Sequence, residues 1–181
     1  MHLLFNNSYH PPFPINCDQV VLGMGCFWGA EKLFWSTSGV WTTAVGYSGG
    51  SSNEANYEKV CSGTTNHAEV VRVIYDKSKI ELESLLKIFW ESHDPTQINR
   101  QGNDIGKQYR SIVFVSDENQ LNKALALRNE VQKYFDKNNI GKIQTEISVC
   151  ENFFYAEEYH QQYLIKNPNG YCGLKGLGVK L

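Results

Sequence analysis

The sequence predicts an α+β protein in which helices pack on a mainly antiparallel or mixed sheet. Helix-like and strand-like segments alternate only in part, because two strand-like segments follow one another between the first two long helical segments. The 181 residues are enough for one domain with a substantial core and too few for two ordinary domains. Hydrophobic residues make up 41% of the chain and charged residues 20%, which is typical of a globular domain.

The first half of the chain contains three predicted strands and two predicted helices. Residues 19–24 form a short apolar run typical of a buried strand, and residues 40–45 predict a second strand. Residues 26–36, between these strands, predict a helix. Residues 68–75 alternate between two faces, which predicts a third strand. Residues 81–92 carry apolar side chains three and four positions apart, which predicts a helix.

The second half repeats the pattern with a longer helix. Residues 111–115 predict a strand, and residues 117–137 predict the longest helix, with Ser116 or Asp117 as its N-cap. Residues 143–149 predict a further strand, and residues 156–164 a short helix. The intervening segments are predicted loops. The first is rich in glycine and serine from residue 46 to 52 and continues to Tyr57, a composition that suits a loop lining a site.

The two ends of the chain differ in composition from the middle. Residues 1–18 contain three of the five prolines and predict an extended N-terminal arm. Residues 19–166 form the predicted catalytic domain. Residues 167–181 contain four glycines and few packing groups, so we expect a flexible C-terminal tail that crosses the surface.

Charge and cysteine usage narrow the classes of function. The formal charge of −2 disfavours a basic nucleic-acid-binding face. No apolar run reaches the roughly 20 residues that span a bilayer, and the first residues lack the pattern of a secretory signal. The five cysteines are widely spaced and form no C-x-x-C pair, which argues against a disulfide framework or a zinc site. We therefore expect a cytoplasmic monomer with no membrane, nucleic-acid or metal partner.

One pentapeptide, Gly25-Cys26-Phe27-Trp28-Gly29, carries the strongest chemical signal. It lies between a predicted strand and a predicted helix, where unpaired helix amides favour negative charge and therefore thiolate. A free cysteine, with a pKa of about 8.5, is otherwise mostly protonated at neutral pH. The pattern predicts a reactive Cys26 beside an aromatic wall, and the alternative is a buried structural cysteine.

Several ordered blocks of this sequence resemble one known family, the A-type peptide methionine sulfoxide reductases. The resemblance extends from about residue 20 to residue 178. The blocks are Gly25-Cys26-Phe27-Trp28-Gly29, Gly46-Tyr47-Ser48-Gly49-Gly50, Tyr57-Glu58-Lys59-Val60-Cys61-Ser62-Gly63, His67-Ala68-Glu69, His93-Asp94-Pro95, Gln101-Gly102-Asn103-Asp104, Gln108-Tyr109-Arg110-Ser111, Tyr155-Ala156-Glu157, His160-Gln161-Gln162-Tyr163 and Asn167-Pro168. The resemblance implies a ferredoxin-like α/β sandwich with a mixed sheet, long loops and a glycine-rich C-terminal tail. It also implies thiol-dependent reduction of methionine S-sulfoxide, free and in proteins, and hence repair of oxidised proteins.

The same resemblance implies a catalytic role for each of five residues. Cys26 would be the nucleophile that attacks the sulfoxide sulfur. Glu69 would be the acid that protonates the departing oxygen, and its apolar strand would raise its pKa. Tyr57 and Tyr109 would hydrogen-bond the sulfoxide oxygen. Asp104 would help to hold the polar network of the site. Without the resemblance, the simplest interpretation of Glu69 is a strand glutamate whose side chain faces water.

The remaining implied roles concern the methyl pocket and the second thiol. Phe27 and Trp28 would form the pocket for the sulfoxide methyl group. Oxygen transfer would leave a sulfenic acid at Cys26, which would condense with Cys172 in the tail. Thioredoxin would reduce the resulting disulfide, and no other cofactor is implied. Cys150 stays open as an alternative to Cys172, although neither Cys150 nor Cys17 has a motif that supports a catalytic role. Cys61 lies in one of the family blocks and is interpreted as structural.

The sequence also allows two other classes of function. A thiol peroxidase would also form a sulfenic acid at Cys26, but it has no need for Glu69, Tyr57 and Tyr109 together. A non-catalytic peptide-binding module would use an aromatic surface around Trp28 and Tyr47. The pattern His67-Ala68-Glu69 also occurs in zinc deaminases, but their P-C-x-x-C partner is missing here.

Overall fold

The computed structural model describes residues 1–51 and 55–181. Within these residues the main sheet contains six strands in the order β7-β6-β1-β3-β2-β8, and β4 and β5 form a separate hairpin. The strands are β1 Cys17–Gly23, β2 Val40–Ser48, β3 Ala68–Asp76, β4 Arg100–Gln101, β5 Asp104–Ile105, β6 Ile112–Val115, β7 Glu146–Val149 and β8 Phe154–Tyr155. All neighbouring pairs of the main sheet are antiparallel except β6 and β7, which are parallel, so the sheet is mixed.

The helices place the chain in the predicted fold class. They are α1 Phe27–Trp35, α2 Tyr57–Cys61, α3 Leu82–Ser92, the 3-10 helix η1 Lys107–Tyr109, α4 Glu118–Lys137 and α5 Tyr163–Lys166. α1 connects β1 to β2 and α3 connects β3 to β6, while the four central strands lie in the order β6-β1-β3-β2. This is the ferredoxin-like β-α-β-β-α-β arrangement. The expected α+β sandwich with a mixed sheet is confirmed.

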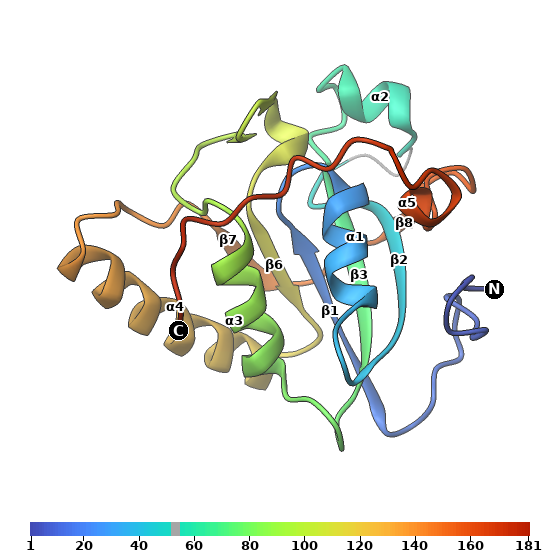
Figure 1. Ribbon diagram of the computed structural model, residues 1–181, viewed down its shortest axis with the longest axis horizontal. Coiled ribbons are helices and arrows are strands. Elements are labelled where there is room, and N and C mark those ends of the chain that lie inside the picture. Colours follow the sequence, from blue (N-terminus) through green and yellow to red (C-terminus); the bar gives the residue numbers. More distant parts are fainter. Residues whose placement is uncertain (52–54) are drawn as a thin grey trace.

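The main core lies on one face of the sheet. Alternation along β3 sends Val71, Val73 and Tyr75 to this face, where they pack with residues of α1, α3 and α4 (Figure 1). Val70 and Ala68 point to the opposite face and join a smaller cluster. Glu69 lies two residues before Val71 on β3, so its side chain points to the same, helix-covered face, where α1 begins.

Most predicted elements agree with the structure to within a few residues. α3 and α4 each begin one residue later than predicted, and the carboxylate of Asp117 caps α4 by accepting from the amide of Gln120 at 2.8 Å. The predicted helix over residues 156–164 is wrong. β8 precedes it, Gln162 has a left-handed backbone with φ of 50°, and only α5 is helical.

The loop predicted from residue 46 also differs from the structure. β2 continues to Ser48, and α2 begins at Tyr57, where a loop was expected. The side chain of Asn56 caps α2 by accepting from the amide of Lys59 at 2.9 Å. Ser52 and Asn53 of the predicted loop lie outside the described residues.

Both ends of the chain pack against the domain. In the N-terminal arm His2 and Tyr9 are buried, and the His2 ring is 2.9 Å from the Thr43 hydroxyl of β2. The tail runs from α5 past the beginning of α1 and along α3 (Figure 1). Val179 is buried in the main core, and the Leu181 amide donates to the Glu91 carboxylate at 2.6 Å.

No helix among the described residues has the length and apolar character needed to cross a membrane.

Candidate active site

Cys26 lies at the junction between β1 and α1, as the sequence predicts. It is the N-cap residue of α1. The preceding Gly25 has φ of 92°, and a Cβ atom there would lie 2.8 Å from the Gln101 side chain. A residue with a side chain would therefore be strained and crowded at this turn, and glycine is required for the chain to enter α1 with Cys26 at its start.

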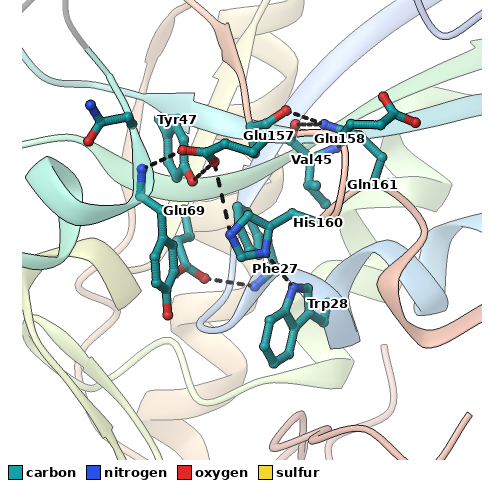
Figure 2. Close-up of polar contacts among 12 residues, drawn as sticks. Phe27, Trp28, Val45, Tyr47, Glu69, Glu157, Glu158, His160 and Gln161 are labelled. Atoms are coloured by element: carbon teal, nitrogen blue, oxygen red, sulfur yellow. Dashed lines mark hydrogen bonds and ion pairs between the residues drawn. The ribbon is translucent and has the colours of Figure 1, made fainter. Parts of the chain in front are cut away.

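Glu69 reaches the same helix start from β3. Its side chain accepts a hydrogen bond from the amide of Phe27 at 3.1 Å (Figure 2). Only 2% of the residue is exposed, so its carboxyl group is removed from water. The contact ties the strand to the first turn of α1 and brings Glu69 beside Cys26.

A cavity of about 190 Å³ gathers the predicted site residues. It draws on α1, α2, β3, β5, η1 and the C-terminal tail. Its lining residues are Cys26, Phe27, Trp28, Tyr57, Glu69, Asp104, Tyr109 and Tyr171. Seven of the eight residues singled out from the sequence therefore meet at one place, and Cys172 is the exception.

The pKa values of Cys26 and Glu69 are both raised. Burial raises the pKa of the Cys26 thiol to about 12, and the carboxylate of Glu69 adds to this effect. The amides of Trp28 and Gly29 hydrogen-bond the sulfur and act in the opposite direction, but they do not outweigh burial. The expectation that the helix start favours thiolate is therefore incomplete. Burial likewise raises the pKa of Glu69 to about 8, although the hydrogen bond from the Phe27 amide acts to lower it. This carboxyl group therefore holds its proton at pH 7.

The two tyrosines predicted from the sequence, Tyr57 and Tyr109, are kept as neutral phenols. Burial raises the pKa of Tyr57 to about 12 and raises that of Tyr109 as well. Nearby acidic groups add to both shifts, and Glu69 is among them. A phenol that keeps its proton is available as a hydrogen-bond donor to an oxygen in the cavity.

Cys172 lies against the first turn of α1. A Cβ atom on Gly29 would be 3.0 Å from the Cys172 sulfur, so the missing side chain at Gly29 lets the tail approach the helix. Cys172 is exposed, and both Cys26 and Cys172 are free thiols in this structure. Cys150 instead packs with the cluster on the opposite face of the sheet, together with Phe153. Of these two candidate partners, Cys172 is on the side of the sheet where Cys26 lies.

Three residues at the site, Tyr171, His160 and Glu157, were not predicted from the sequence motifs. Tyr171 lines the cavity, and its hydroxyl donates to the Asp104 carboxylate at 3.1 Å. Its position next to Cys172 was a signal that could have identified it. His160 and Glu157 contact the cavity residues from outside, and both belong to sequence blocks to which no role was given.

The aromatic surface around Trp28 and Tyr47, which the alternative of a peptide-binding module requires, is not formed by Tyr47 in the structure. Tyr47 has no exposed area, and its hydroxyl donates to the Glu157 carboxylate at 2.8 Å. It packs beside Phe27 with ring centroids 5.8 Å apart. Tyr47 therefore belongs to the interior, and it cannot form a docking surface with Trp28.

Among the described residues, no group of three or more histidine, cysteine, aspartate or glutamate side chains could hold a metal ion.

Comparison with known proteins agrees with this geometry. A family model described as peptide methionine sulfoxide reductase matches residues 18–177. Peptide methionine sulfoxide reductase MsrA of Azotobacter vinelandii is 53% identical over 180 residues, which are 99% of this chain and 83% of that protein. Methionine sulfoxide reductase A of Corynebacterium diphtheriae is a solved structure with a TM-score of 0.88 at 39% identity, covering 94% of this chain and 83% of that one. Mxr1 from Saccharomyces cerevisiae, solved in complex with Trx2, has a TM-score of 0.61 at 25% identity, covering 88% of this chain and 93% of that one. With the family model matching most of its length, the chain belongs to the peptide methionine sulfoxide reductase family.

Proposed function

We propose that this oxidoreductase reduces methionine S-sulfoxide, free and in proteins, by a two-thiol cycle recycled by thioredoxin. The observation that carries the proposal is the shared cavity, where a half-buried thiol, a protonated carboxyl group, three phenols and two further aromatic rings meet. A thiol peroxidase has no need for Glu69, Tyr57 and Tyr109 together. The assembled acid and donors favour a substrate whose oxygen leaves from sulfur.

The first half of the cycle transfers one oxygen atom. Cys26 attacks the sulfoxide sulfur while Glu69 gives its proton to the sulfoxide oxygen, and the proton that the Cys26 thiol loses restores the Glu69 carboxyl group. In net terms the thiol and the sulfoxide become a sulfenic acid at Cys26 and the thioether methionine, so Cys26 is oxidised by two electrons and the substrate is reduced by two. Because burial holds the pKa of Glu69 near 8, the carboxyl group is protonated at pH 7 and can supply this proton.

The other cavity residues orient the substrate. Phe27 and Trp28 receive the methyl group, since methyl and sulfur atoms pack favourably against aromatic rings. Tyr57 and Tyr109 donate hydrogen bonds to the sulfoxide oxygen, where negative charge develops. Asp104, which accepts from the Tyr171 hydroxyl, supports the polar side of the cavity.

The second half of the cycle restores both thiols. The Cys172 thiol condenses with the Cys26 sulfenic acid, which forms a disulfide and releases water. The thioredoxin dithiol then reduces this disulfide and becomes a disulfide itself. The potential of thioredoxin, about −270 mV, suits this exchange. The yeast relative solved with Trx2 supports a partner of this kind. We assign the cycle to a monomer in the cytoplasm, because one chain supplies both thiols and a reducing compartment keeps them free.

Activity on separate sulfoxide epimers tests the proposal. The S and R epimers of N-acetylmethionine sulfoxide are incubated with the protein, thioredoxin and its reducing system, and methionine formation is measured. We expect turnover of the S epimer only. Equal turnover of both epimers would contradict the epimer assignment, and no turnover of either would overturn the proposed function.

Removing the two phenols tests the role of the tyrosines. Tyr57→Phe or Tyr109→Phe alone is expected to lower kcat by about 10²–10³-fold, and the double variant by more, because each hydroxyl stabilises charge that forms only in the transition state. Rapid-quench measurement of the first turnover gives the rate. KM should change less than kcat, and a change confined to KM would show that the hydroxyls only bind substrate.

A further inference from the structure

His160 does not line the cavity, but it contacts three residues that do. Its imidazole centroid lies 5.1 Å from the ring of Phe27, 5.8 Å from that of Trp28 and 4.8 Å from that of Tyr57. Only 1% of His160 is exposed. A single buried side chain thus supports cavity residues that come from both α1 and α2 (Figure 2).

The indole of Trp28 is held by two contacts with different geometric effects. One ring face stacks on Tyr163, with centroids 3.8 Å apart and an interplanar angle of 11°. Stacking fixes the plane of the indole but not the direction of its N–H edge, because a half-turn about the Cβ–Cγ bond leaves the plane unchanged. The indole N–H donates to Nδ1 of His160 at 3.0 Å, and this directional bond selects one of the two orientations.

The hydrogen bond also defines the protonation state of His160. An indole N–H can only donate, so Nδ1 must be a bare acceptor and the proton of the neutral ring lies on Nε2. Burial lowers the pKa of His160, although the nearby Glu157 carboxylate opposes the shift. The ring is therefore neutral at pH 7, as the bond from Trp28 requires.

The turn that carries His160 is itself tied to the domain. The Gln162 amide donates to the buried Glu31 carboxylate of α1 at 2.8 Å. The side-chain amide of Gln161 donates to the Val45 carbonyl of β2 at 2.8 Å and accepts from the Val45 amide at 2.9 Å. These bonds hold the backbone on the C-terminal side of His160 against β2 and α1.

We infer that His160 is a positioning residue that fixes the orientation of the Trp28 indole and so sets the width of the methyl pocket. The inference rests on the proposed function, which assigns Trp28 to that pocket. His160 acts through Trp28 and not on the substrate, because it does not line the cavity and its Nδ1 atom is occupied. The expected consequence is a preference for methyl over larger alkyl sulfoxides.

The test compares His160→Ala with His160→Asn. The side-chain oxygen of asparagine can still accept a hydrogen bond from the indole N–H of Trp28. His160→Ala is expected to raise KM for methionine S-sulfoxide by about three- to tenfold, as for one lost hydrogen bond. It should also lower the ratio of kcat/KM for methionine over ethionine S-sulfoxide, and His160→Asn should restore most of both. Equal losses in the two variants would overturn the inference.

Both variants are also made in Trp28→Phe, which has no N–H to donate. There His160→Ala and His160→Asn should behave alike, since the bond that separates them is absent. A persistent advantage of asparagine in this background would mean that His160 acts on something other than Trp28.

A readout that needs no activity separates this inference from the proposed function. The Trp28 indole proton, assigned by NMR through its loss in Trp28→Phe, should be protected from exchange in the native protein and in His160→Asn, and exposed in His160→Ala. His93→Ala is the control for losing a buried histidine, because the His93 ring contacts Phe89 and Ser111 and its loss should leave the Trp28 signal unchanged. Unchanged protection in His160→Ala would overturn the inference even in a fully active enzyme. A native protein that reduces no sulfoxide would overturn only the proposed function.

Discussion

Replacing Glu69 with glutamine is expected to slow the formation of the Cys26 sulfenic acid by about 10²–10⁴-fold at pH 7, the usual contribution of a general acid. Glutamine is nearly isosteric, and its side-chain oxygen can still accept from the Phe27 amide, so the first turn of α1 should keep its position. The variant loses only the proton that the sulfoxide oxygen needs. The rate is measured by rapid quench with Cys172→Ser in the background, so that one turnover is isolated.

The pH profile should separate a proton donor from a merely structural Glu69. In the native protein the rate should fall as pH rises through about 8, where the carboxyl group loses its proton. The glutamine variant should lack this dependence. Glu31→Gln is the matched control, because Glu31 is also buried with a pKa raised to about 7 but does not line the cavity. An unchanged pH profile in Glu69→Gln would contradict the assignment.

The same pKa shift predicts a change in stability. The pKa of Glu69 is raised from 4.5 to about 8 on folding, so between these values the folded protein holds a proton that the unfolded chain releases. The free energy of unfolding therefore decreases as pH rises from about 4.5 to about 8. Because glutamine cannot ionise, Glu69→Gln should melt at a higher temperature than the native protein at pH 9, even though it is less active.

The architecture could be predicted because apolar periodicity records which side chains face the core. The spacing in residues 81–92 recovered α3 to within one residue, and alternation placed Val71, Val73 and Tyr75 together. The failure at residues 156–164 has a tertiary cause. Gln161 and Gln162 bond to β2 and α1, and these contacts hold a turn where local preference favours a helix.

The site could be predicted only in part from the residues themselves. A cysteine at a strand-to-helix junction is visible in the sequence, but Tyr57, Glu69, Asp104 and Tyr109 are far apart in the chain and were assembled only by the family resemblance. The burial of Cys26 is not visible in the sequence around it, because it depends on residues from distant parts of the chain. It is the main reason why the pKa of Cys26 is raised, where the helix start alone predicted the opposite.

Replacing Cys172 with serine should abolish thioredoxin-dependent turnover and leave one product per enzyme. The first oxygen transfer does not need Cys172, so the burst of methionine should form at nearly the native rate. The Cys26 sulfenic acid then loses the thiol of the tail that lies against the first turn of α1, and Cys150 packs with the cluster on the opposite face of the sheet. Mass spectrometry after dimedone treatment should find one sulfenic acid adduct, at Cys26.

Cys150→Ser is the matched control, since it removes a half-buried thiol that also lies late in the chain. This variant should turn over with thioredoxin as the native protein does. If Cys172→Ser kept multiple turnover while Cys150→Ser lost it, the resolving role would belong to Cys150, and a large rearrangement across the sheet would be required. The position of Cys172 against Gly29, on the first turn of the helix that begins at Cys26, instead demands only a local movement of the tail.

The contact of Val179 with the main core holds the far end of the tail while Cys172 moves, so disulfide formation should alter protease sensitivity between residues 167 and 178 more than at Val179.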